Sequence, residues 1–82
     1  MSSFIRNFNN LMGIMLLMLE DSYPNNRILA SKSIETACKF DPQIYLQCQR
    51  RLLDMLSDQN LLVRRTSIET LYNLTDLLVL NV

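Results

Sequence analysis

The chain has 82 residues, which allow one small domain, and 49% of them are apolar, which is enough for a packed core. Eight basic and eight acidic side chains cancel to a formal net charge of zero, so no overall field draws the chain to nucleic acid or to anionic lipid. The absence of histidine excludes an imidazole base and an imidazole metal ligand.

The first predicted element is a helix over residues 4–20. Its run Leu11–Leu19 is far shorter than the ~20 apolar residues that a membrane span needs. Glu20, Asp21 and Ser22 follow the run and make a poor signal-peptide cleavage site. The pattern therefore predicts a buried core helix in a soluble, cytosolic protein, rather than a signal peptide or a membrane span.

A second helix is predicted over residues 25–40. Pro24 should stop the preceding helix, and Asn25 or Asn26 should cap the new one. Its expected inner face comprises Ile28, Leu29, Ile34, Ala37 and Cys38.

A third helix is predicted over residues 42–56, with Asp41 as its cap and Pro42 in its first position. The inner stripe expected for this helix comprises Ile44, Tyr45, Cys48, Leu52, Met55 and Leu56. Both cysteines then lie on apolar faces, which favours reduced core thiols over a disulfide.

The polar turn 57–60 is short enough to join an antiparallel helix pair, and a fourth helix is predicted over residues 61–80. Its expected inner face comprises Val63, Ser67, Ile68, Leu71 and Leu74. The closing segment 77–82 is apolar and lacks the polar cap that natural repeat stacks carry at their ends. We therefore expect marginal stability or self-association, either as a piece of a longer stack or as a chain that pairs with another.

Two internal matches indicate a repeat. Ser-Ile-Glu-Thr occurs at Ser33–Thr36 and again at Ser67–Thr70, one 34-residue step later, which is the length of a two-helix repeat. Met18–Asp21 resembles Met55–Asp58 at a step of 37 residues, and we place the three extra residues in the turn that holds Tyr23 and Pro24. The sequence thus predicts an all-α solenoid of about two helix pairs, filling residues 1–82 as a single segment.

The stretch Leu52–Leu74 resembles a HEAT repeat, with its acidic turn Asp58–Asn60 followed by the basic pair Arg64-Arg65. More specifically, it is similar to the N-terminal trunk of the large adaptin subunits of clathrin-type adaptor complexes, which end the second helix with a pair such as Leu71-Tyr72. Upstream segments resemble the delta- and epsilon-type adaptins in particular: Leu19–Ser22, Asn25–Arg27 and Phe40–Pro42. The resemblance covers residues 18–76 and departs from the family at Ser31 and Ser33, where glycine or alanine is expected.

The resemblance implies a right-handed α-α superhelix of the HEAT type that belongs to a longer adaptin-type trunk. It also implies a non-enzymatic scaffold in vesicle-mediated intracellular protein transport. Its partners would be the other subunits of an adaptor complex, and its membrane association would be peripheral, through that complex, on Golgi or endosomal coat membranes. Two alternatives remain: an importin-like HEAT module that binds cargo, and a small membrane-associated helical protein. The near absence of charge over residues 4–20 argues against a surface amphipathic helix.

The candidate contact residues are charged. Arg50, Arg51, Arg64 and Arg65 supply half of the positive charge and could meet an acidic partner or a phosphoinositide headgroup. The plainer alternative is a solvated helix face with local pairs such as Arg65 with Glu69. By analogy with HEAT stacks, Asp58 and Arg64 could also act together between neighbouring repeats. We assign no catalytic, cofactor-binding or metal-binding residue, because no nucleophile or glycine loop accompanies the carboxylates.

Overall fold

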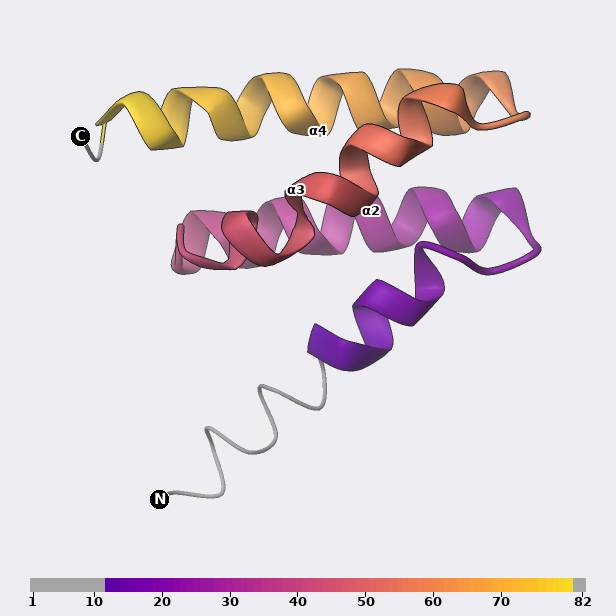
Figure 1. The fold of residues 1–82 in the computed structure, drawn as a ribbon, viewed down its shortest axis with the longest axis horizontal. Coiled ribbons are helices and arrows are strands. Elements are labelled where there is room, and N and C mark those ends of the chain that lie inside the picture. The colour runs from indigo at the N-terminus through magenta and orange to yellow at the C-terminus, as the bar shows by residue number, and fades with distance from the viewer. Residues whose placement is uncertain (1–11, 81–82) are drawn as a thin grey trace.

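The computed structural model describes residues 12–80, with side chains for residues 12–76, and this part of the chain is all-helical. A helix over residues 12–18 is followed by α2 (Pro24–Phe40), α3 (Ile44–Asp54), the 3-10 turn η1 (Met55–Ser57) and α4 (Leu61–Leu80). The helix over 12–18 and α3 run in one direction, and α2 and α4 run back in the other (Figure 1). The chain therefore forms two consecutive helix pairs, as the sequence predicts.

The core lies where the two pairs stack. α2 and α4 lie side by side, and α4 packs more extensively against α2 than against its own partner helix α3. The buried apolar side chains form one cluster with contributions from every helix: Met12, Met15, Leu19, Ala30, Ile34, Cys38, Ile44, Tyr45, Cys48, Leu52, Met55, Val63 and Leu74. The buried cluster is therefore shared by the two helix pairs.

The helix starts differ from the predicted ones at two prolines. α2 begins at Pro24 itself, and neither Asn25 nor Asn26 caps it. Proline is favoured in the first helical position because its missing N–H has no partner there, so Pro24 starts α2 rather than only ending the helix before it. α3 begins at Ile44 rather than at residue 42, because Asp41 and Pro42 lie in a turn in which the Asp41 carboxylate accepts a hydrogen bond from the Gln43 N–H.

The other boundaries agree more closely. The helix over 12–18 ends two residues before the predicted end at Glu20, and the predicted part 4–11 lies outside the described residues. α3 gives way to the 3-10 turn η1 near the predicted end at residue 56. α4 spans the predicted 61–80, and the Asn60 side chain caps it by accepting hydrogen bonds from the N–H groups of Leu62 and Val63.

Three residues assigned to inner faces are exposed instead. Leu29 and Ile68 are each 54% exposed and Leu56 is 37% exposed, so these assignments are wrong. Ser31 and Thr70 are buried although the sequence did not mark them. Ser67, which was assigned to the inner face, is buried and donates its hydroxyl to the Leu52 carbonyl at 2.6 Å. A small hydroxyl side chain can form a hydrogen bond across a helix contact, as Ser67 does to α3, so it fits where two helices approach closely.

The two copies of Ser-Ile-Glu-Thr do not occupy equivalent places. The helices that contain them begin 37 residues apart, at Pro24 and Leu61, whereas the copies lie 34 residues apart. Ile34 of the first copy is fully buried, while Ile68 of the second is exposed. The structural register is therefore 37 residues, and the tetrapeptide match does not mark equivalent positions or three extra residues in the turn that holds Tyr23 and Pro24.

Both cysteines are free and buried, as predicted. Burial raises the pKa of the Cys38 thiol to about 12, with smaller contributions from Cys48, Asp41 and Glu35, and burial also raises the pKa of Cys48. Since the thiolate is the reactive form, only about one Cys38 side chain in ten thousand is ionised at pH 8. We expect iodoacetamide to leave both thiols unmodified in the folded protein and to modify both in guanidinium chloride. A mass-spectrometric time course checks this, and rapid modification without denaturant would contradict it.

Candidate functional site

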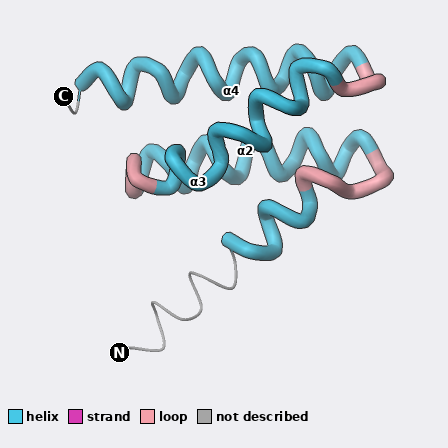
Figure 2. Tube along the Cα trace, viewed as in Figure 1, coloured by secondary structure: helices cyan, strands magenta, loops and turns pink. Residues whose placement is uncertain are grey.

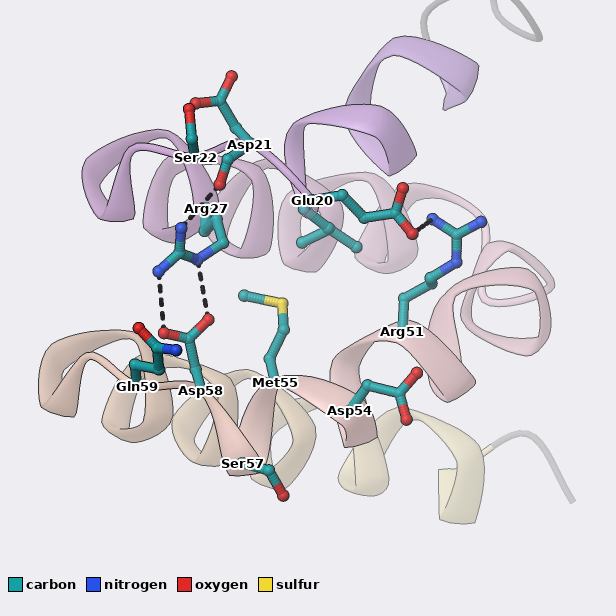
Figure 3. A pocket seen from close by; sticks show the side chains of 11 residues that line it. Glu20, Asp21, Ser22, Arg27, Arg51, Asp54, Met55, Ser57, Asp58 and Gln59 are labelled. Atoms are coloured by element: carbon teal, nitrogen blue, oxygen red, sulfur yellow. Dashed lines mark hydrogen bonds and ion pairs between the residues drawn. The ribbon is translucent and has the colours of Figure 1, made fainter.

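The two inter-helix turns that follow the helix over 12–18 and η1 lie at the same end of the molecule, opposite the turn that joins α2 to α3 (Figure 2). A cavity of about 470 Å³ opens between them, and both turns contribute charged side chains to its wall. Arg27 of α2 lies between Asp21 and Asp58, while Arg51 of α3 faces Glu20 on the other side of Met55 (Figure 3). Six of its lining side chains are charged, whereas the cavity between the helix over 12–18 and α2 has none in its wall.

Arg27 joins the two turns with a single guanidinium. Its Nε and Nη2 donate to the two carboxylate oxygens of Asp58 at 2.8 and 2.9 Å, and its Nη1 donates to the Asp21 carbonyl at 2.7 Å. The Arg27 and Asp58 side chains are only 15% and 12% exposed. A two-pronged, largely buried pair of this kind is stronger and more specific in geometry than a surface ion pair.

The electrostatics of Asp58 follow from these contacts. Burial raises the pKa of Asp58, but it is outweighed by the hydrogen bonds from Arg27 and from the Asn60 N–H and by the positive charges of Arg27 and Arg64. The net result is a pKa below the usual range of an aspartate. Asp58 is therefore held in its charged form as the acceptor of a fixed network.

A pH dependence follows from the lowered pKa. A carboxylate whose pKa is lower in the folded state stabilises the fold above its unfolded pKa of about 3.9, and that stabilisation is lost as the pH falls through the folded value. We expect the free energy of unfolding to fall as the pH drops below about 4, and Asp58→Asn to flatten that fall. Urea titrations across the acid range measure it. Asp54→Asn is the control, because Asp54 meets only the exposed Arg50, and equal acid sensitivity of both variants would contradict the expectation.

The two turns repeat the same hydrogen bonds at a step of 37 residues. The Asp21 N–H donates to the Met18 carbonyl at 3.1 Å, and the Asp58 N–H donates to the Met55 carbonyl at 3.2 Å. Each aspartate carboxylate then accepts the N–H two residues on, from Tyr23 at 2.8 Å and from Asn60 at 2.9 Å. These matches show that the resemblance between Met18–Asp21 and Met55–Asp58 is structural.

An arginine completes each turn six residues after its aspartate. Arg27 Nη1 donates to the Asp21 carbonyl, and Arg64 Nη1 donates to the Asp58 carbonyl at 2.6 Å and to the Gln59 carbonyl at 3.2 Å. The sequence pattern predicted that Asp58 and Arg64 act together between neighbouring repeats. The structure shows that Arg64 braces the backbone of its own turn, and that the carboxylate of Asp58 is taken by Arg27 from the preceding pair.

The remaining arginines make weaker contacts. Arg51 Nη1 lies 3.0 Å from Glu20 Oε1 and 3.3 Å from the Leu16 carbonyl, so it ties α3 to the first helix near the cavity. Arg50 lies 3.8 Å from Asp54 with both side chains exposed, and such pairs contribute little. Arg65 is exposed and forms no ion pair with Glu69 in the part of the chain that the structure describes.

The structure brings Asp58 and Arg51 to the cavity, places Arg64 on the far side of the Asp58 turn, and leaves Arg50 and Arg65 on the solvated surface. Sequence reasoning missed Arg27 and Glu20. A signal for Arg27 was present, because Asp21 and Arg27 share the spacing of Asp58 and Arg64. No comparable signal marked Glu20, whose partner lies on another helix.

Chemically, the cavity holds paired charges and no activated group. Arg27, Asp58, Arg51 and Glu20 are already engaged with each other, so the arrangement holds two turns together rather than offering a base or a nucleophile. Within residues 12–76, no group of three or more histidine, cysteine, aspartate or glutamate side chains is placed to hold a metal ion. Among the helices described, none combines the length and apolar character needed to cross a membrane.

Comparison with known proteins returned no family model, no curated protein and no solved structure that matches this chain.

Proposed function

We propose that this chain is a non-enzymatic helical-repeat scaffold that acts by protein–protein contact. The observation that carries the proposal is the repeated turn, whose two copies are joined across the helix pairs by the Arg27–Asp58 ion pair. A link of this kind fixes how one pair stacks on the next, and extended stacks of such pairs present large surfaces to partners. The stack belongs, in this proposal, to the right-handed HEAT type.

The titratable groups support a scaffold over an enzyme. Enzymes lower the pKa of a thiol nucleophile and raise that of a carboxylic acid that donates a proton. Here burial raises the pKa of Cys38 and Cys48, which makes them poorer nucleophiles, and the network around Asp58 lowers its pKa. The two thiols and Asp58 therefore lack the shifts expected of a thiol nucleophile and of a proton-donating carboxylic acid.

The resemblance to adaptin trunks gives the scaffold its proposed setting. In this setting the chain is a segment of the large subunit of an adaptor complex, and it acts in vesicle-mediated intracellular protein transport. Its partners are the other subunits of the complex, and the complex brings it to cytoplasmic faces of Golgi or endosomal membranes. The turn Asp58–Asn60 and Arg64, on which the resemblance rests, form one hydrogen-bonded unit, which supports reading them together as a repeat motif.

Reconstitution with defined subunits tests this setting. The chain is co-expressed with the medium, small and beta-type subunits of each adaptor complex in turn, and the complexes are analysed by size-exclusion chromatography. We expect stoichiometric co-elution with the subunits of one complex. The variant Leu52→Asp, which places a charge in the core, is the control for contacts made by unfolded chain. A folded chain that elutes apart from every subunit set would overturn the adaptor assignment.

A further inference from the structure

The donor and acceptor of the Arg27–Asp58 pair recur in Arg64 and Asp21, and within residues 12–76 neither of these has an ion-pair partner. Arg27 braces the Asp21 carbonyl with Nη1 and grips the Asp58 carboxylate with Nε and Nη2. Arg64 braces its own turn in the same way, but its Nε and Nη2 meet no carboxylate among residues 12–76. Asp21 likewise accepts the Tyr23 N–H but meets no arginine within those residues. One copy therefore presents a donor on its second helix pair and the matching acceptor on its first.

The apolar surfaces follow the same 37-residue register. Ser31, which lies one turn after Arg27, is buried against the second pair and donates its hydroxyl to the Met55 sulfur at 3.7 Å. Its equivalent, one turn after Arg64, is Ile68, which is 54% exposed. The position of α4 that corresponds to the stacked Ser31 of α2 is therefore apolar and open.

The first helix pair has a cavity that corresponds to a surface of the second pair. An apolar cavity of about 510 Å³ lies between the helix over 12–18 and α2, with Met15, Met18, Ser33 and Ala37 in its wall. One step of 37 residues later, these positions are Leu52, Met55, Thr70 and Leu74, which are all buried where the second pair stacks on α2. In the second pair, these positions form part of the surface on which α2 packs. The cavity in the first pair therefore corresponds to that packing surface.

From this correspondence we propose that the chain binds a second copy of itself head to tail. Arg64 of one copy pairs with Asp21 of the next, and Ile68 enters the cavity of about 510 Å³ beside Ser33 and Ala37. Charge is complementary, because the joint repeats the Arg27–Asp58 pair. The side-chain sizes are complementary too. Inside one copy, the small Ser31 packs against the second pair. At the joint, the larger Ile68 takes the place of Ser31 and packs against the small side chains of Ser33 and Ala37. The proposal does not depend on the adaptor assignment.

A dimer formed by a head-to-tail joint still has one unused surface of each kind, so further copies add and the assembly grows with concentration. Analytical ultracentrifugation of the full chain over a range of concentrations should show species larger than a dimer. Raised salt should weaken them, because the joint contains an ion pair. A chain that remains monomeric at every concentration would overturn the proposal.

Two surface variants test the polarity of the joint. We call the surface around Arg64 and Ile68 the tail, and the surface around Asp21 and the apolar cavity the head. Ile68→Glu blocks the tail, and Leu29→Glu, at the rim of the cavity, blocks the head. Both side chains are 54% exposed, so the fold tolerates the change. Each variant alone should be monomeric. Their equimolar mixture should give a species of twice the monomer mass and nothing larger, because one intact head then meets one intact tail. A mixture that stays monomeric, or single variants that still associate, would overturn the proposal.

Two further variants distinguish the proposed head-to-tail contact from non-specific association of the chains. Leu46→Glu makes the same change on α3, at a side chain that is 70% exposed and outside both surfaces, and it should associate like the unmodified chain. Asp21→Asn, placed in the Ile68→Glu chain, keeps an oxygen for the Tyr23 N–H but removes the charge. It should weaken the mixed dimer by about tenfold or more, as the loss of a charged hydrogen bond does. An unchanged affinity would overturn the assignment of Asp21 as the partner of Arg64.

Discussion

Arg27→Ala should lower the free energy of unfolding by about 3 kcal/mol, because it leaves the largely buried Asp58 carboxylate without its partner. The same change removes the hydrogen bond to the Asp21 carbonyl, so both turns lose an anchor. In a chain of this size the melting temperature should fall by more than about 10 °C. Thermal and urea unfolding, followed by circular dichroism, measure the effect.

A double-mutant cycle isolates the pair itself. Asp58→Ala and the double variant with Arg27→Ala complete the cycle, and the coupling energy should be at least about 1.5 kcal/mol. Arg50→Ala is the matched control, since its contact with Asp54 is exposed and should be worth less than about 0.5 kcal/mol. Equal effects of Arg27→Ala and Arg50→Ala would show that the pair does not hold the two helix pairs together.

Leu52→Ala should cost about 3 kcal/mol, because Leu52 is fully buried in the cluster that all the helices share. The truncated side chain leaves a cavity near the C-terminal end of α3, and the surrounding helices can fill such a cavity only in part. Urea unfolding should show a lower midpoint than that of the unmodified chain, or no folded baseline at all.

Leu46→Ala provides the comparison within the same helix. Leu46 is 70% exposed, so the identical substitution removes almost no buried surface, and alanine is the better helix former. We expect a change within about 0.5 kcal/mol of zero. If Leu46→Ala destabilised the chain as much as Leu52→Ala does, the core would lie on the other face of α3.

The sequence predicted the helix pairs because long apolar periodicity and turn residues are local signals. It placed α4 over 61–80 and identified the buried stripe of α3 up to Met55, since each depends on spacing within one helix. It failed at Leu29 and Ile68, which are apolar but exposed. Whether such a side chain is covered depends on which face the next pair meets, and that is a property of stacking rather than of one helix.

In the candidate site, too, features that depend on local sequence could be predicted, and features that depend on stacking could not. Asp58 could be selected from its turn, because an acidic residue before a capping asparagine is a local motif. Its partner Arg27 lies 31 residues away, and Arg64 is the nearer and more obvious candidate in the sequence. The repeated tetrapeptide also suggested a 34-residue register that the structure replaces with 37.

The two sets of hydrogen bonds made by the Arg27 guanidinium group also affect how the molecule unfolds. In a one-dimensional stack, stability is the sum of a term for each repeat and a term for each interface between neighbours. Arg27 contributes to both terms at once, since Nη1 holds its own turn and Nε and Nη2 hold the next. A chain with so strong an interface term has no favourable state in which one helix pair is folded and the other has melted. The two pairs should therefore unfold as a single cooperative unit.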